Sequence, residues 1–194
     1  MTKLILASTS KIRHTILTNA GLECEAVSPT VDESRLKIDI ATKPTHNLAL
    51  ELAKRKALSI ENPKALIIGA DQTLICNGIF YDKPSSIAEA TTQLKKLRGQ
   101  KHILNSAIAV ALDGKIIWST SATAELIMRH FSDKYISTYV AANEPHLLHC
   151  VGAYQLEGQG VQLFDQIKGD YFTILGLPLL PLLAFLRQVG FLTT

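Results

Sequence analysis

Two apolar stretches of the chain each end at polar residues that could bind and cleave a phosphate compound. The first stretch, residues 4–7, leads into Ser8 and Arg13. The second, residues 65–70, leads into Asp71. Hydroxyl and guanidinium groups bind phosphate oxygens, and a carboxylate can hold a metal ion or accept a proton from water. Because ligands of open α/β folds collect beyond the carboxyl ends of the strands, this pattern predicts an enzyme that handles phosphates.

Ser10 stands where a helix is expected to begin, and Arg13 follows it by about one turn. Unpaired N–H groups and the dipole at a helix N-terminus attract anions, so Arg13 and Ser8 could complete a phosphate site there. The same residues also suit an ordinary arrangement, with Ser10 as a helix cap and Arg13 on the surface. The spacing alone favours that second interpretation.

Lys56 falls on the apolar side of a predicted helix. At about 100° per residue it lies in the same stripe as Leu52 and Ala53. A lysine that points inward must be paired or must bind an anion. The alternative is a lysine whose stem covers apolar surface while its ammonium group reaches water, and the sequence favours neither.

Three further charged residues are candidates for the same chemistry. Asp71 follows six uncharged residues, and a carboxylate at the end of a buried strand needs a cation, donors or a catalytic role. A turn or capping role for Asp71 is less favoured, because residues 72–75 continue as strand-like sequence. Glu33 could bind a metal, although a solvated acidic loop is the simpler interpretation. Lys83 is held in an extended conformation by the following Pro84. The alternative interpretation of this stretch is an ordinary surface turn.

The composition indicates a globular protein with one core, which could be divided into two lobes. The chain has 194 residues, of which 47% are hydrophobic and 19% charged. Its net charge of +3, without a basic run, argues against a nucleic-acid partner. Three widely spaced cysteines predict reduced thiols and a cytoplasmic location. The apolar run 173–186 is short and broken by glycine and proline, so no membrane span is expected.

Periodicity and turn residues predict a mixed α/β sheet. Strands are expected at residues 3–7, 23–28, 65–70, 101–111 and 115–129. Helices are expected at residues 10–20, 47–60, from a Ser86–Glu89 capping box to Gly99, from Ser132 to about Ala142, and from near Pro178. Asn77-Gly78 and Asp113-Gly114 predict hairpin turns. A charged loop is expected before Asn47.

These residues, in this order, resemble the Maf family of nucleoside triphosphate pyrophosphatases. The matching stretches are Leu4 to Ser10 with Arg13, Val31-Asp32-Glu33, Leu52 to Ala57, Gly69-Ala70-Asp71, Lys83-Pro84, Leu97-Arg98-Gly99 with His102, Tyr139-Val140, Gly152-Ala153-Tyr154, Glu157-Gly158, Gly169-Asp170-Tyr171 and Gly176 to Leu179. The likeness runs nearly end to end, and the ordered combination is far more specific than any single stretch.

The resemblance implies a fold, a reaction and roles for individual residues. The fold would be a two-lobed Maf/ITPase-like α/β domain over residues 1–194, with an elongated mixed β-sheet flanked by helices and an active-site cleft between the lobes. The reaction would be hydrolysis of a nucleoside triphosphate to a monophosphate and pyrophosphate with Mg²⁺ or Mn²⁺. Asp71 would accept the proton of the attacking water, and Glu33 and Asp71 would hold the metal. The triphosphate would be bound by Ser8, Ser10, Arg13, Lys56 and Lys83, with Arg13 and Lys83 also acting in catalysis.

Three positions bear on the nucleobase. Gln72 and Glu157 resemble the branch of the family that acts on 7-methyl-GTP, and a carboxylate at Glu157 suits the N–H donors of a guanine edge. Ile12 stands where that branch usually carries a tryptophan, which could stack on a cationic base. The alternative is the branch that acts on dTTP and UTP.

A rival interpretation of another class is a non-catalytic nucleotide-binding regulator, since the family has been tied to septum formation in dividing cells. It predicts nucleotide binding without turnover. In both cases the expected partner is a nucleoside triphosphate, with no nucleic acid and no membrane. The sequence leaves the oligomeric state open, a homodimer included.

Overall fold

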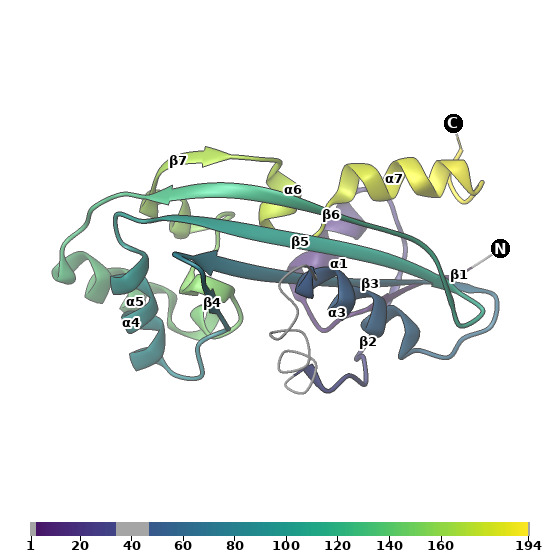
Figure 1. Ribbon diagram of the computed structural model, residues 1–194, viewed down its shortest axis with the longest axis horizontal. Helices are drawn as coiled ribbons and strands as arrows, with labels where there is room; N and C mark the ends of the chain where they lie inside the picture. Colours follow the sequence, from purple (N-terminus) through teal and green to yellow (C-terminus); the bar gives the residue numbers. More distant parts are fainter. Residues whose placement is uncertain (1–2, 34–46, 194) are drawn as a thin grey trace. The chain divides into compact units, whose positions relative to one another are not determined.

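A computed structural model describes residues 3–33 and 47–193, and it contains a mixed sheet of seven strands with helices packed around it (Figure 1). The strands are β1 (Lys3–Ala7), β2 (Glu25–Val27), β3 (Ala65–Cys76), β4 (Ile79–Tyr81), β5 (Lys101–Leu112), β6 (Lys115–Met128) and β7 (Phe164–Lys168). Their order is β2-β1-β3-β5-β6-β7, and β4 pairs with β3. β1 runs parallel to β2 and β3, whereas β4 and β7 are antiparallel to their neighbours, so the predicted mixed α/β fold is confirmed.

The helices follow the predicted succession closely. They are α1 (Lys11–Asn19), α3 (Leu48–Leu58), α4 (Ile87–Leu97), α5 (Asp133–Leu147), α6 (Tyr171–Ile174) and α7 (Leu179–Gln188), with 3₁₀ turns η1 (Val151–Ala153) and η2 (Gln159–Leu163). The chain divides into two compact units, and β3, β5 and β6 each contribute one part to each unit.

The first unit comprises residues 1–72, 106–122 and 176–194. Figure 1 shows α3 and α7 on opposite sides of its strands. The core on the α3 side consists mainly of alanines together with two isoleucines. Its members are Ile5, Ala7, Ala49, Ala53, Ala57, Ala65, Ile67, Ala107, Ala109 and Ala111. Small residues let the helix backbone approach the sheet closely. On α7, Phe185 stacks on Trp118 of β6, with ring centroids 4.8 Å apart.

The second unit comprises residues 73–105 and 123–175. Its core is rich in leucine and aromatic side chains from α4, α5, the strands and the connection between β6 and α5, including Leu94, Leu97, Leu126, Phe131 and Tyr139. Each long helix begins at a side-chain cap, because Ser86 accepts a hydrogen bond from the Glu89 N–H at 3.2 Å and Ser132 accepts one from the Tyr135 N–H at 3.1 Å.

β3 continues to Cys76, as the strand-like sequence of residues 72–75 indicated. Two details differ from the sequence-based predictions. α5 continues to Leu147, about one turn beyond the expected end. The Ser86–Glu89 capping box is only half formed, because the Glu89 carboxylate accepts its hydrogen bonds from the N–H and hydroxyl of Ser85. The charged loop expected before Asn47 lies outside the described residues.

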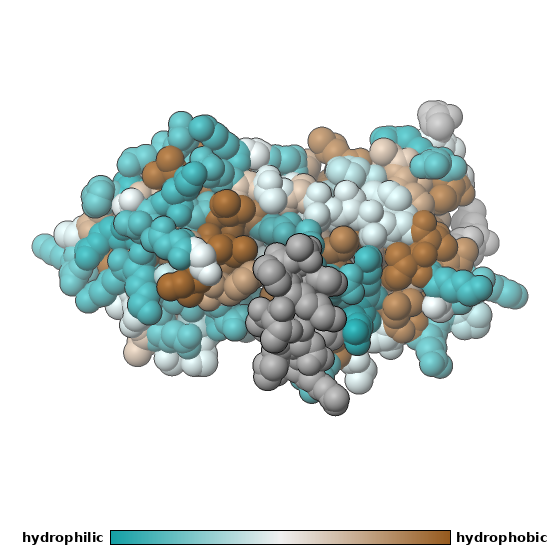
Figure 2. Space-filling view, in the orientation of Figure 1, coloured by the Kyte–Doolittle hydropathy of each residue, from teal (hydrophilic) through white to brown (hydrophobic). Residues whose placement is uncertain are grey.

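The face shown in Figure 2 mixes polar area with separate apolar patches. Ile79 and Phe80 on β4 are among the exposed apolar side chains. All three cysteines are free thiols, as the spacing predicted. Among the described residues, no helix combines the length and the apolar character needed to cross a bilayer.

Candidate active site

The site lies where β1 ends beside the longer strand β3. β1 pairs with β3 as far as Gly69, and β4 begins to pair with β3 at Leu74. Asp71 and Gln72 lie in the interval between these two pairings. Because side chains alternate along a strand, these two neighbours point to opposite faces of the sheet. The site is therefore built from two groups of residues, one on each face of β3.

On the α3 face, Lys56 joins two carboxylates. Its Nζ lies 2.5 Å from Oδ1 of Asp71 and 2.8 Å from Oε1 of Glu33. The side chains of Lys56 and Asp71 are 9% and 11% exposed, whereas that of Glu33 is 45% exposed. The predicted inward direction of Lys56 is thus confirmed, and its charge is paired rather than carried out to water.

Gly69 explains why this ion pair forms. A Cβ at Gly69 would overlap the backbone carbonyl of Ala53 and press on the backbone of Ala57. The absence of a side chain lets α3 lie directly on β3 at this point. Lys56 is close in sequence to Ala53, and Asp71 follows Gly69 by two residues on the same face, so the close approach brings ammonium and carboxylate together.

On the other side of the same strand, Arg13 is fixed by backbone carbonyls. Its Nε donates to the Gly176 carbonyl and its Nη1 to the Ala70 carbonyl, each at 2.8 Å. Nη1 also reaches the Ser8 hydroxyl at 3.5 Å, so the predicted contact between Arg13 and Ser8 is present. Burial lowers the pKa of the Arg13 guanidinium, and the negative charges of Asp71 and Glu33 oppose that shift. Arg13 remains a cation close to both carboxylates.

Gln72 lies on the Arg13 side as well. Its Nε2 donates to the hydroxyl of Ser106, on β5, at 2.9 Å. A Cβ at Gly176 would lie 3.2 Å from Nη2 of Arg13 and 3.6 Å from Oε1 of Gln72. The bare Cα of Gly176 is therefore the place where the guanidinium and the carboxamide come together.

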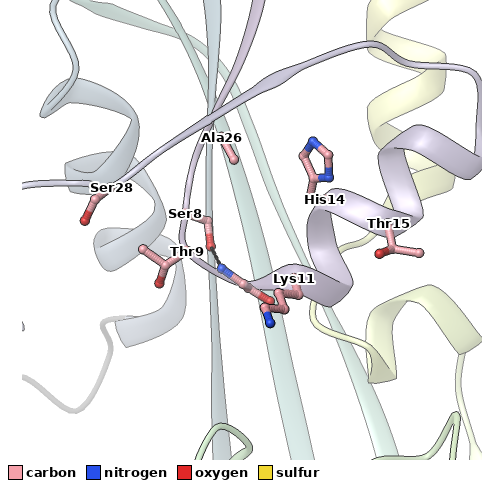
Figure 3. Close-up of a pocket in the computed structure, with 8 residues that line it drawn as sticks. Ser8, Thr9, Lys11, His14, Thr15, Ala26 and Ser28 are labelled. Carbon is pink, nitrogen blue, oxygen red and sulfur yellow. Dashed lines mark hydrogen bonds between the residues drawn. The ribbon is translucent and has the colours of Figure 1, made fainter.

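A pocket of about 430 Å³ opens beside this group, at the start of α1 (Figure 3). It is lined by Ser8, Thr9, Ser10, Lys11, His14, Thr15, Ala26 and Ser28. Figure 3 shows Ser8 and Thr9 on the loop and His14 and Thr15 on the helix. Ser10 occupies the cap position, and its N–H donates to the Ser8 hydroxyl at 3.2 Å. Ser8 thus belongs both to the pocket and to the surroundings of Arg13.

Lys83 and Glu157 belong to the second unit, where they lie near the same thiol. The pKa of Cys150 is raised to about 11, chiefly by burial and also by the Glu157 carboxylate, while the Lys83 ammonium acts to lower it. The structure thus brings these two predicted site residues into one neighbourhood. Their place beside Asp71 stays a prediction, as does the role of Ile12, which is half-buried in the first turn of α1.

A family model described as "Maf-like protein" matches residues 3–189. The chain belongs to the Maf family. Among its relatives, a Caulobacter vibrioides protein named nucleoside triphosphate pyrophosphatase is 47% identical, over 100% of this chain and 98% of that protein. A Rhizobium johnstonii protein named 7-methyl-GTP pyrophosphatase is 44% identical, over 97% of this chain and 96% of that protein.

Among solved structures, a Mycobacterium abscessus protein titled nucleoside-triphosphatase / dITP/XTP pyrophosphatase is 14% identical. The structural match covers 96% of this chain and 97% of the Mycobacterium abscessus chain, with a TM-score of 0.39. A likeness at that level is too low to extend to details of the site.

This Maf protein offers a metal ion two carboxylates on the α3 face. Across residues 3–33 and 47–193, no three His, Cys, Asp or Glu side chains gather as a metal cluster. Asp71 and Glu33 nevertheless converge on one Nζ atom. One or two carboxylates, completed by substrate phosphates and water, are the usual ligands of Mg²⁺, so the donor set fits that ion.

Sequence reasoning noted Ser106 only as a position where the Maf family often carries threonine, and it assigned neither Ser106 nor Gly176 a contact in the site. Both contacts join residues far apart in the chain, because Gln72 and Ser106 are 34 positions apart and Arg13 and Gly176 are 163 apart. Gly176 opens one of the stretches that resemble the family, which was the only available signal. Its positive φ of 91° also suits glycine.

Proposed function

We propose that this Maf protein is a nucleoside triphosphate pyrophosphatase, which hydrolyses the α–β phosphoanhydride to release a nucleoside monophosphate and pyrophosphate. The observation that carries the proposal is the buried contact of Lys56 with Asp71, beside the fixed guanidinium of Arg13. The full-length relatives named as pyrophosphatases support the same reaction.

The charges at the site suit that reaction. Cleavage between the α and β phosphorus atoms develops negative charge on the pyrophosphate leaving group, and fixed cations stabilise it. Arg13 and Lys56 are such cations, and Lys83 is proposed as a third. Asp71 is proposed to accept the proton of the water that attacks the α-phosphorus, which a buried carboxylate beside a cation can do when its geometry is fixed.

A divalent cation, Mg²⁺ or Mn²⁺, is proposed as cofactor, held by Asp71 and Glu33. When bound, it would supply positive charge to the phosphate oxygens. Lys56 touches the same two carboxylates and keeps them close together before any cation arrives. Its positive charge also offsets the repulsion between them.

For the nucleobase, 7-methyl-GTP or a related purine nucleotide is the proposed substrate. Relatives at 44–45% identity carry the name 7-methyl-GTP pyrophosphatase, and Gln72 and Glu157 match that branch. Ile12 lacks the aromatic ring expected there, so we propose that selection relies on hydrogen bonds more than on stacking. A preference for dTTP or UTP is the alternative.

The test is a panel of nucleoside triphosphates with Mg²⁺ or Mn²⁺, in which the phosphorus products are identified. The proposal predicts equal amounts of monophosphate and pyrophosphate, with 7-methyl-GTP or another purine nucleotide turned over fastest. Release of inorganic phosphate and a diphosphate would contradict the site of cleavage. Nucleotide binding without any turnover would favour the alternative that the protein is a non-catalytic nucleotide-binding regulator.

A further inference from the structure

Lys56 already serves as the cation between Asp71 and Glu33. Its Nζ lies 2.5 Å from Oδ1 of Asp71 and 2.8 Å from Oε1 of Glu33. These two carboxylates are also the ones proposed to hold a divalent cation. An ion bound through the same two oxygens would meet the ammonium group at close range, because both oxygens already contact it, and two cations at close range repel each other.

The charges around Lys56 are also balanced without a metal ion. Asp71 and Glu33 carry two negative charges, and Lys56 and Arg13 carry two positive charges. Arg13 takes part in this balance, since its guanidinium interacts with the charges of both carboxylates. A divalent cation is attracted less strongly to carboxylates whose charge is already offset. The pairing that stabilises the fold therefore works against the binding of a metal ion.

The two carboxylates differ in how readily they can change partner. The side chains of Asp71 and Lys56 are only 11% and 9% exposed, so their contact is enclosed by the protein. The side chain of Glu33 is 45% exposed. An ion that arrives from solvent reaches Glu33 first. The contact between Lys56 and Glu33 is therefore the one that a dissolved cation can replace.

From these contacts we infer that Lys56 competes with the divalent cation for Glu33. Lys56 gives up Glu33 when the cation binds, and its ammonium group then has an N–H donor available for the phosphate oxygens of the substrate. A lysine has three N–H donors and no acceptor, so a donor that leaves a carboxylate can turn to a phosphate. The inference rests on the proposed pyrophosphatase function, which supplies both the cation and the triphosphate.

The experiment is a titration of the nucleotide-free protein with Mn²⁺, in which EPR spectroscopy measures the concentration of free ion. Lys56→Met removes the competing charge, so its Kd for Mn²⁺ is expected to be roughly tenfold lower than that of the unsubstituted protein. Lys54→Met is the matched control, because it removes a lysine of the same helix that pairs with Glu51. The Kd of this control is expected to stay within roughly twofold of the unsubstituted value, since solvent and salt screen such a charge.

Two further variants locate the effect and guard against misfolding. In Lys56→Met combined with Glu33→Gln, one of the two carboxylates is lost, so the tighter binding is expected to disappear. Lys56→Met also removes the ion-pair partner of the buried Asp71, which is costly to the fold. Should it fail to fold, Lys56→Gln gives the same reading, because its carboxamide is uncharged and can still donate a hydrogen bond to Asp71.

Four results would overturn the inference. One is a Kd of Lys56→Met, or of Lys56→Gln in its place, that is unchanged or higher than that of the unsubstituted protein. Another is an equal gain in Lys54→Met, which would mark a general effect of net charge. A gain that survives Glu33→Gln would place the ion elsewhere. Absence of Mn²⁺ binding in every one of these proteins would leave Lys56 no competitor.

The titration contains no nucleotide, so its result is separate from the test of the proposed function. If the unsubstituted protein releases no pyrophosphate from any nucleotide in the panel, the pyrophosphatase proposal fails whatever the Kd values are. If it releases pyrophosphate and Lys56→Met binds Mn²⁺ no more tightly, only the competition between Lys56 and the cation fails.

Discussion

Lys56 and Asp71 form a buried ion pair, with Nζ 2.5 Å from Oδ1, although they are 15 positions apart and on different elements. The pair forms because Gly69 lets α3 lie directly on β3. Buried charges are tolerated when they are paired, and they are costly when one partner is removed. The ion pair therefore ties the fold of the first unit to the proposed chemistry.

Replacing Lys56 tests the role of its charge. Lys56→Met keeps the length of the side chain but removes the cation that joins Asp71 to Glu33. We expect the rate of pyrophosphate release to fall by roughly 100-fold or more, because a fixed charge near the leaving group is lost. The matched control is Lys54→Met on the same helix, where the lysine pairs with Glu51 at the surface. A control that loses as much activity as Lys56→Met would refute the assignment.

Adding a methyl group at Gly69 tests the packing that creates the pair. The new Cβ of Gly69→Ala would overlap the backbone of Ala53, so α3 must move away from the sheet. We expect the free energy of unfolding to fall by roughly 3 kcal/mol, at the upper end for overpacking. Gly158→Ala is a suitable control, since a Cβ there meets nothing closer than 3.8 Å. Urea denaturation gives both values, and equal midpoints would contradict the account.

Gly176→Ala tests the packing of Arg13 and Gln72 against Gly176. The added methyl group must displace one of these side chains, so pyrophosphate release is expected to fall by about tenfold or more. Gly190→Ala controls for backbone strain, because Gly190 also has a positive φ and a Cβ there meets nothing within 4 Å. Both variants should lose some stability, but only Gly176→Ala should lose activity. If Gly190→Ala loses activity to the same extent, the packing of Arg13 and Gln72 against Gly176 has no special role in activity.

His102 predicts a pH dependence of stability in the second unit. Its ring is 1% exposed, its Nε2 lies 2.9 Å from the Tyr154 hydroxyl, and its Nδ1 has no hydrogen-bond partner among the described residues. Burial lowers the pKa of His102 from 6.5 to about 4. Between pH 6.5 and pH 4 the unfolded chain therefore binds a proton that the folded protein does not, and the folded state loses stability as the pH falls.

Over that interval the expected loss from His102 is about 3 kcal/mol. His102→Gln removes the titrating group, so its free energy of unfolding should fall less steeply between pH 7 and pH 4 than that of the unsubstituted protein. Urea denaturation at several pH values measures both slopes. Identical slopes for the two proteins would show that His102 is not the group responsible.

Much of the site could be predicted where the signal is local. The helical stripe that contains Lys56 indicated its inward direction, and the uncharged run before Asp71 indicated its burial. Periodicity reports which way a side chain faces, because it depends only on residues a few positions apart. The predicted elements were confirmed for the same reason, with α5 longer than expected.

The partners of these side chains could not be predicted in the same way. Arg13 was expected to reach toward Ser8 and the start of its own helix or to lie on the surface, whereas its two shortest hydrogen bonds go to Ala70 and Gly176. Those carbonyls are brought near by the pairing of β1 with β3 and by the turn before α7. Backbone carbonyls occur at every position, so residue types give no sign of which one an arginine will meet.

The central claim is that Asp71 takes part in the hydrolysis, and Asp71→Asn tests it most directly. The substitution keeps the size of the side chain but removes its negative charge and its ability to take a proton. The measurement is pyrophosphate release from the preferred nucleotide, with Asp165→Asn on exposed β7 as the control. We predict a fall of roughly 100-fold or more for Asp71→Asn and little change for Asp165→Asn. Equal rates of release by Asp71→Asn and the unsubstituted protein would contradict the account.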